Sequence, residues 1–202
     1  MPHTHRSKSL AVLLVAFAAA IGACRITPDV ASPADQSERL RDGYRLMTDA
    51  ARADEAGRTQ DAIRLYREAV GVAPELAAAW SNLGVLYQRQ SEYPAAAECY
   101  QRAANHAPSD PRPSTNLGVL YQSRDYYEPA LEHFREALRR DPNYLPALRG
   151  AVRTAAVLER RDQQLLEWTE RGILIEQDPE WLEVFQRQRI STQSVIEKGL
   201  GT

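Results

Sequence analysis

Apolar residues recur along the middle of the chain at the spacing of α-helices. In residues 77–110, one set of apolar residues repeats every three or four positions, and a second set follows after a short polar stretch. Residues three and four apart share one face of a helix, so each set predicts an amphipathic helix. Val, Ile and Thr do not form the alternating runs that are typical of strands. The pattern therefore predicts an all-α chain built from helix pairs. The two sets are Trp80, Leu83 and Tyr87, followed by Ala96, Tyr100 and Ala103.

The helix-pair pattern recurs with a period of 34 residues. The seven letters NLGVLYQ occur at residues 82–88 and again at residues 116–122, and the apolar positions around them recur with the same offset. A fixed period of this length is typical of stacked helical repeats. The small residues in the pattern allow the two helices of a unit to approach closely. The packing residues predicted for residues 77–110 and 111–144 are Trp80, Leu83, Gly84, Tyr87, Ala96, Tyr100, Leu117, Gly118, Tyr121, Ala130 and Phe134.

Less regular units flank these two. Residues 43–76 keep the pattern of the second helix but carry Asp49 where the first helix should have a Leu. Residues 145–178 predict a fourth, degenerate unit, because Gln164 and Arg171 stand where small residues are expected. The predicted repeat domain spans residues 37–178.

Polar residues mark the expected starts of helices. Ser91 and Asp125 are predicted N-caps of second helices, and Glu128 lies at capping-box spacing from Asp125. Asp110 and Asp178 are each followed by Pro, which predicts an N-cap with Pro at the first helical position.

Residues 179–202 predict a C-terminal helix with an apolar stripe of Trp181, Val184 and Phe185. Terminal elements of repeat arrays cover the exposed end of the stack. A dimerisation helix is the alternative, and the sequence leaves both open.

The repeated positions resemble the tetratricopeptide repeat. Residues 77–110 agree with all eight signature positions of that family, and residues 111–144 depart from them at Ser114. The resemblance covers residues 43–144. It implies an α-α superhelix in which the first helices of the units line a concave face, and it implies a protein that binds other proteins through that face.

The resemblance also implies which side chains line the face. Asn82 and Asn116 stand where peptide-binding members hold a peptide backbone. Leu, Gly and Tyr of the repeated block have packing roles, whereas the Asn, Val and Gln have none that the pattern assigns. We therefore expect both units to present the same Asn-Val-Gln strip to an extended or helical segment of a partner. The predicted groove residues are Ser81, Asn82, Val85, Gln88, Arg89, Arg112, Thr115, Asn116, Val119, Gln122, Arg149 and Arg153.

Residues 1–23 are typical of a lipoprotein signal peptide. A polar start with Arg6 and Lys8 precedes an apolar stretch that is too short to span a bilayer as a helix. The stretch ends in IGAC, which resembles a lipobox and predicts lipidation of Cys24. Acyl chains on this residue would anchor the chain in a membrane. A secreted protein cut after an Ala, or an uncleaved anchor, is the alternative.

Residues 24–36 follow the predicted lipidation site. They contain Pro28 and Pro33 and few apolar residues, so they predict a flexible tether. Arg25, rather than an Asp, follows the Cys and favours the outer membrane, with the domain facing the periplasm.

Composition and charge point to no chemistry of the chain's own. The net charge is −2, so charge alone suggests neither nucleic acid nor an anionic membrane as a partner. His106 and His133 are lone residues without ligands at metal spacing, and Cys99 is expected to be an inert packing residue. We expect no cofactor, no metal and no enzymatic activity.

The sequence thus predicts a membrane-anchored scaffold of the bacterial cell envelope that binds a protein partner. In plan it resembles repeat lipoproteins of pilus assembly, such as the TadD and pilotin families. Two alternatives stay open: a self-assembling structural protein of the envelope, and an accessory subunit of an envelope enzyme.

Overall fold

The computed structural model describes residues 32–199. The chain divides into two units, Met1–Gln36 and Ser37–Thr202, and the following description concerns the second unit and the start of the first helix. The predicted signal peptide, Cys24 and residues 25–31 of the predicted tether lie outside the described residues. Within residues 32–199, no helix is both long enough and apolar enough to cross a membrane.

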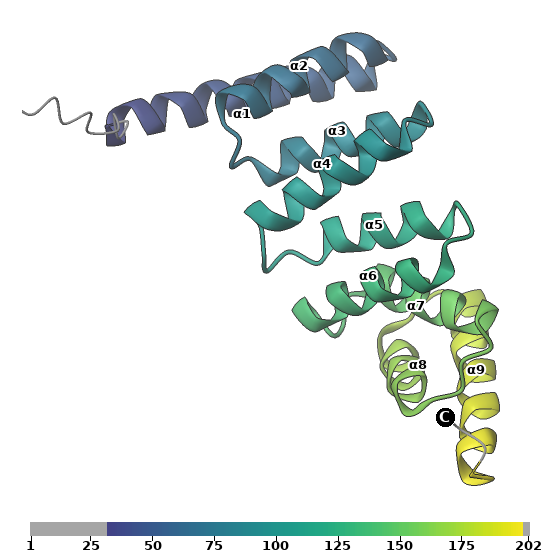
Figure 1. Ribbon diagram of the computed structural model, residues 1–202. Helices are drawn as coiled ribbons and strands as arrows, with labels where there is room; N and C mark the ends of the chain where they lie inside the picture. Colours follow the sequence, from purple (N-terminus) through teal and green to yellow (C-terminus); the bar gives the residue numbers. More distant parts are fainter. Residues whose placement is uncertain (1–31, 200–202) are drawn as a thin grey trace, which may run out of the picture. The chain divides into compact units, whose positions relative to one another are not determined.

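Across this range nine α-helices follow one another (Figure 1). The first eight form four pairs, α1 with α2 through α7 with α8, and α9 follows the last pair. The predicted all-α architecture of stacked helix pairs is confirmed. The helices are α1 (Pro33–Glu55), α2 (Thr59–Val72), α3 (Ala77–Arg89), α4 (Tyr93–His106), α5 (Arg112–Gln122), α6 (Tyr127–Arg140), α7 (Leu145–Val157), α8 (Gln163–Ile175) and α9 (Pro179–Glu197).

Helix α1 begins within the predicted tether. The N–H of Ser32 donates to the Asp35 carboxylate at 3.0 Å, and the N–H of Asp35 donates to the Ser32 hydroxyl at 3.2 Å. This reciprocal pair is a capping box, and Pro33 occupies the first helical position, where its missing N–H costs nothing. Residues 33–36 of the predicted tether are therefore helical, because local capping starts the helix at Pro33.

A residue in the left-handed conformation follows the first helix of every pair. These residues are 34 positions apart, and their φ angles are 72° at Gly57, 63° at Ser91, 62° at Asp125 and 54° at Glu159. In each turn, the N–H of the next residue donates to a carbonyl five residues back, as in a Schellman motif, with N···O distances of 2.8–3.0 Å. The turn keeps its register through all four pairs, so the degenerate fourth pair is a unit of the same repeat.

The turn geometry corrects two predicted caps. Ser91 and Asp125 end first helices, whereas α4 and α6 begin at Tyr93 and Tyr127 without a side-chain cap. The Asp125 carboxylate accepts a hydrogen bond from the Tyr127 hydroxyl at 2.7 Å instead of forming a capping box. The chain reversal needs one left-handed residue, and this need overrides the capping preference of the same side chains.

Of the other two predicted caps, one is wrong and one is confirmed. Helix α5 begins at Arg112 with Pro111 as its N-cap, so Asp110 lies one residue before the cap, although its carboxylate accepts the N–H of Arg112 at 2.9 Å. The Asp178 carboxylate accepts the N–H of Glu180 at 2.9 Å at the start of α9.

The turn at Glu159 allows a test of the backbone strain that a residue other than Gly has in the left-handed conformation. Glu159 is exposed, and an L-residue in the left-handed region costs roughly 1 kcal/mol relative to Gly. We expect Glu159→Gly to raise the free energy of unfolding by about 1 kcal/mol, and Gly57→Ala to lower it by a similar amount. Urea denaturation at an unchanged m-value measures both changes. A destabilised Glu159→Gly protein would contradict the assignment of strain to this turn.

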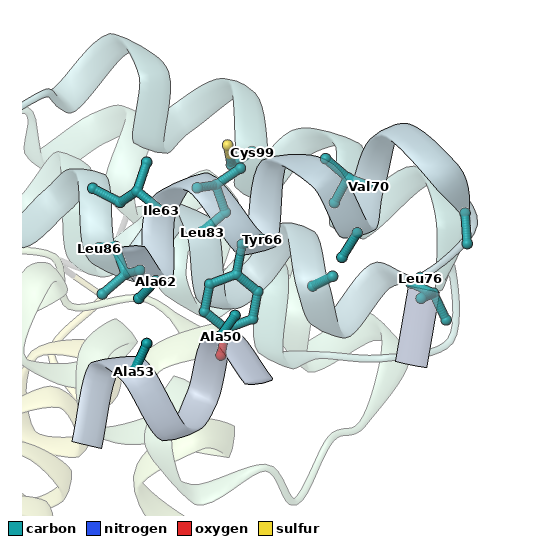
Figure 2. Packing of buried hydrophobic residues seen from close by; sticks show 13 residues of the cluster. Ala50, Ala53, Ala62, Ile63, Tyr66, Val70, Leu76, Leu83, Leu86 and Cys99 are labelled. Atoms are coloured by element: carbon teal, nitrogen blue, oxygen red, sulfur yellow. The ribbon is translucent and has the colours of Figure 1, made fainter. Parts of the chain in front are cut away.

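Buried alanines and rings join the first helix pairs. Figure 2 shows the cluster that connects α1 and α2 with α3, and Tyr66 of α2 points there toward Ala50 of α1. Tyr66 is 3% exposed and Ala50 is fully buried. The first pair therefore packs on the second although Asp49 replaces the Leu that the pattern predicts in α1.

Helix α8 explains the irregular fourth unit. Asp162 accepts the N–H of Leu165 at 2.9 Å, and the helix begins at Gln163, two residues later in the repeat than α4 and α6. The delay rotates the helix, so Leu165, Trp168 and Gly172 are buried while Gln164 and Arg171 are not. A shift of the buried face, rather than large residues in the core, accounts for the unusual sequence.

Helix α9 packs against this last pair. Phe185 is fully buried, and Trp181 and Val184 pack against the same core cluster as α7 and α8 (Figure 1). The apolar stripe thus covers the end of the stack within the chain itself. Gly199, with φ of 67°, follows the end of the helix.

Candidate interaction face

The first helices of the pairs carry all twelve predicted groove residues, and we call the surface that these residues were predicted to form the helix A face. Three uncharged members of the set are hydrogen-bonded to other helices. Asn82 joins α3 to α2, Gln88 joins α3 to α4, and Gln122 joins α5 to α7. These side chains therefore have a role in the fold that the repeat pattern did not assign. The donor–acceptor distances are 3.1 Å from the Asn82 amide to the Tyr66 hydroxyl, 2.9 Å from the Tyr100 hydroxyl to Gln88 Oε1, and 2.8 Å from Gln122 Nε2 to the Thr154 hydroxyl.

Two further predicted groove residues are packing residues. Val85 is half-buried against a cluster that includes Tyr100 and Leu117. Thr115 is 4% exposed, and its hydroxyl donates to the Pro111 carbonyl at 2.9 Å. Both side chains face their own array rather than a partner.

The arginines of the helix A face are largely neutralised. Arg89 contacts the Asp54 carboxylate at 2.9 Å, and Arg112 contacts its neighbour Asp110 at 2.7 Å. Arg149 makes two hydrogen bonds to Glu176, at 2.7 and 2.8 Å, and the Glu176 side chain is 1% exposed. The Arg89 and Arg149 pairs link separate parts of the array, the Arg112 pair is local to the start of α5, and together they leave little net charge for a ligand.

Four predicted groove residues remain, and their side chains make no hydrogen bond or ion pair within residues 32–199. They are Ser81, Asn116, Val119 and Arg153. Asn116 is half-buried, and Val119, one turn further along α5, is 43% exposed. Arg153 has no acidic partner in this range, and its guanidinium lies 4.7 Å from the centre of the Trp181 ring. The two copies of the repeated block therefore differ in their contacts, and only the second has an Asn without a hydrogen bond beside an exposed Val.

Comparison with known proteins agrees with this architecture. Residues 75–143 match the family model for the tetratricopeptide repeat. The two helix pairs within this range, α3 with α4 and α5 with α6, are similar to tetratricopeptide repeats. No curated protein sequence matches the chain. The predicted repeat resemblance is thus confirmed, while the predicted resemblance to pilus-assembly lipoproteins stays a prediction.

Solved tetratricopeptide domains share the fold at low sequence identity. The first such domain of Spaghetti (RPAP3), bound to the HSP90 peptide SRMEEVD, has 17% identity and a TM-score of 0.55 over 59% of this chain and 95% of its own. The Sgt2 domain from Aspergillus fumigatus has 23% identity and a TM-score of 0.54 over 58% and 79%. The Arabidopsis OM64 domain has 17% identity and a TM-score of 0.55 over 59% and 98%. At these identities the likeness shows the fold.

A hollow extends the helix A face of the tetratricopeptide array toward α9. It has a volume of about 300 Å³ and lies between Arg153 and Ala156 of α7 and Glu180, Trp181 and Val184 of α9. The sequence assigned Trp181 to the capping stripe alone. In the structure, the guanidinium groups of Arg149 and Arg153 lie over the Trp181 ring, and the ring forms one wall of the hollow. The spacing of Trp181 in the sequence did not indicate this.

The titratable side chains inside the tetratricopeptide array are packing groups. His133 stacks on Tyr121 with ring centres 5.2 Å apart, and burial lowers its pKa. Burial raises the pKa of the Cys99 thiol to about 11, so the thiol is protonated at neutral pH. Among residues 32–199, no group of three or more His, Cys, Asp or Glu residues is placed to hold a metal ion.

Proposed function

We propose that this chain is a scaffold that holds a segment of a partner protein on its helix A face. The observation that carries the proposal is the pair formed by Asn116 and Val119. An amide without a hydrogen bond can donate to and accept from a peptide backbone, and an exposed Val next to it can bury an apolar side chain of the ligand. The pair is one helical turn long, so both side chains reach the same segment.

Other exposed apolar residues lie on the same set of helices. Tyr44 on α1 is 53% exposed, and Val157 on α7 is 51% exposed. Large apolar side chains exposed to water favour an interaction surface. These two residues and the hollow at Trp181 lie on helices that precede and follow α5 in the chain.

A similar solved domain supports the choice of ligand. The Spaghetti (RPAP3) domain is described as bound to an HSP90 peptide. We infer that this chain also takes a peptide segment, but that it uses the third repeat for it, because Asn82, Gln88 and Gln122 already have partners in the array.

We further propose that the scaffold is anchored in a bacterial envelope through a lipid on Cys24, and that its partner belongs to an envelope assembly. The N-terminal sequence supports this step, since the IGAC stretch resembles a lipobox. Expression with an alkyne-labelled fatty acid tests it. The native chain should take up the label and Cys24→Ala should not. Equal labelling of both, or of neither, would contradict the anchor.

Photo-crosslinking tests the ligand site. A benzoylphenylalanine at position 119 should form adducts with one partner in cells, whereas the same group at Glu132, an exposed position of α6, should not. Mass spectrometry of the adducts identifies the partner. Identical adducts at both positions, or no adduct at position 119, would remove the proposal.

A pair of variants then measures the site. We expect Val119→Arg to weaken binding of the identified partner at least tenfold, or about 1.4 kcal/mol, with the melting temperature almost unchanged. Asn82→Ala should instead lower the free energy of unfolding by about 1 kcal/mol, because it leaves the Tyr66 hydroxyl without its donor. Titration calorimetry and thermal unfolding separate the two effects. Unaltered binding by a folded Val119→Arg protein would place the partner elsewhere.

A further inference from the structure

A second pocket lies between the start of α4 and the turn that joins α5 to α6. It has a volume of about 310 Å³, at the low end of the roughly 300–1,000 Å³ typical of ligand sites. It opens between the first turn of α4 and the end of α5, and none of the predicted groove residues lines it. The lining residues are Tyr93, Pro94, Ala97, Leu120, Tyr121, Arg124 and Tyr126.

The repeat sequence accounts for the space inside this pocket. Ala97 stands where the preceding and following repeats carry Ile63 and Leu131, so a smaller side chain leaves the space open. The exposed rim differs as well. Tyr126 replaces the Glu92 and Arg160 that stand at the same position of the neighbouring repeats.

The walls are aromatic and carry hydrogen-bond donors. The Arg124 guanidinium lies 4.6 Å from the centre of the Tyr93 ring, and the Tyr121 and Tyr126 rings meet edge to face at 6.4 Å. Within residues 32–199, the guanidinium makes no ion pair or hydrogen bond, and the hydroxyls of Tyr121 and Tyr126 have no partner either. A guanidinium can only donate. The pocket thus offers ring surfaces, unused donors and one uncompensated positive charge.

We propose that this pocket binds a proline-containing segment of a partner protein in the polyproline II conformation, with an acidic residue beside Arg124. Proline has no N–H, so such a segment presents carbonyl acceptors that match the donors of the walls. Proline rings pack well on aromatic side chains, as in other grooves that recognise polyproline II helices. The positive charge of Arg124 selects the acidic neighbour. The site is separate from the helix A face and does not depend on the proposed function of that face.

Fluorescence anisotropy with the full-length chain in detergent tests the proposal. The probe is a labelled peptide of three Pro-Pro-Asp units, and the reference peptides are three Gly-Ser-Asp units and three Pro-Pro-Lys units. We expect saturable binding of the first peptide and at least tenfold weaker binding of the other two.

Three variants place the binding in the pocket. Ala97→Leu fills the space with the side chain that the next repeat already holds at this position, and Tyr126→Ala removes a side chain that is 60% exposed, so both should fold. Each should weaken binding of the acidic proline peptide at least tenfold. Leu174→Ala, which removes a leucine of α8 that is 83% exposed, should bind as the native chain does.

Several results would overturn the proposal. The native chain could fail to bind the acidic proline peptide, or it could bind the Gly-Ser-Asp peptide equally well. A folded Ala97→Leu protein could also bind with native affinity. Self-association of the native chain that Ala97→Leu abolishes would assign the pocket to a second copy instead.

Discussion

Replacing Glu176 with Gln is expected to lower the free energy of unfolding by about 3 kcal/mol. The Glu176 carboxylate is 1% exposed and receives two hydrogen bonds from Arg149, together with the N–H groups of Gln177 and Asp178 at 2.9 Å each. The Arg149 guanidinium also lies 5.1 Å from the centre of the Trp181 ring on α9. The neutral amide of Gln leaves Arg149 without its counter-charge, and breaking a buried pair from one side is strongly destabilising.

The pH dependence gives an independent measure of the same contact. The hydrogen bonds from Arg149 are the main cause that lowers the pKa of Glu176 from 4.5 to about 2. A carboxylate whose pKa is depressed in the folded state stabilises the fold above its unfolded pKa and loses that contribution as the pH falls. The difference in stability between the native chain and Glu176→Gln should therefore be constant above about pH 5 and shrink toward zero near pH 2.

An exposed pair serves as the control. Arg187 and Glu183 are 2.7 Å apart on α9, and their side chains are 67% and 72% exposed. Glu183→Gln should change the free energy of unfolding by less than about 0.5 kcal/mol at any pH, because water screens the pair. Chemical denaturation of the three proteins from pH 2 to pH 7 measures the set. An equal loss in both variants would show that the burial of Glu176 has no special effect.

The ion pair between Arg149 and Glu176 is a contact that the sequence could not predict. The period of 34 predicted the helix pairs and their stacking, and the Asp-Pro pattern predicted the cap at Asp178, because each depends on residues close together in the chain. Arg149 was predicted to line the groove, since its repeat position points there. Its partner lies 27 residues away in a loop that is unique to the last unit, and no periodicity predicts such a contact.

The two copies of the repeated block also make contacts that the sequence could not predict. Asn82 and Asn116 occupy the same repeat position, but only Asn82 has a hydrogen bond, which it makes to the Tyr66 hydroxyl. The equivalent partner of Asn116 would be Tyr100, but the Tyr100 hydroxyl donates to Gln88 instead. Identical residues in the two copies therefore differ in which hydrogen-bonding groups are left unpaired, because their neighbours differ. The sequence located the helix A face, whereas the structure was needed to separate the packing residues from the candidate contacts at Asn116 and Val119.

Gly150→Ala should lower the free energy of unfolding by about 2 kcal/mol, although Ala is the better helix former. Gly150 stands at the repeat position of Asn82 and Asn116. A Cβ there would lie 2.3 Å from Cε1 of Phe134, which is fully buried, and Gly118 meets the same ring with its own Cβ position 2.6 Å away. With a helix on both sides, the ring has no room to move away. Overpacking of this kind costs roughly 1–3 kcal/mol, which exceeds the gain in helix propensity.

Two further variants show whether the ring is the cause. Gly71 in α2 has no atom within 4 Å of its Cβ position, so Gly71→Ala should be neutral or stabilising by up to about 1 kcal/mol. Phe134→Leu removes the ring, and in that background Gly150→Ala should cost at least 1 kcal/mol less than in the native chain, a coupling that a double-mutant cycle in urea detects. Additive effects would mean that Gly150 is required for another reason. Coupling would instead explain why Gly150 stands where the two preceding repeats have Asn. Asn82 can donate to the hydroxyl of Tyr66, whereas Phe134 has no acceptor and needs the space that only Gly leaves.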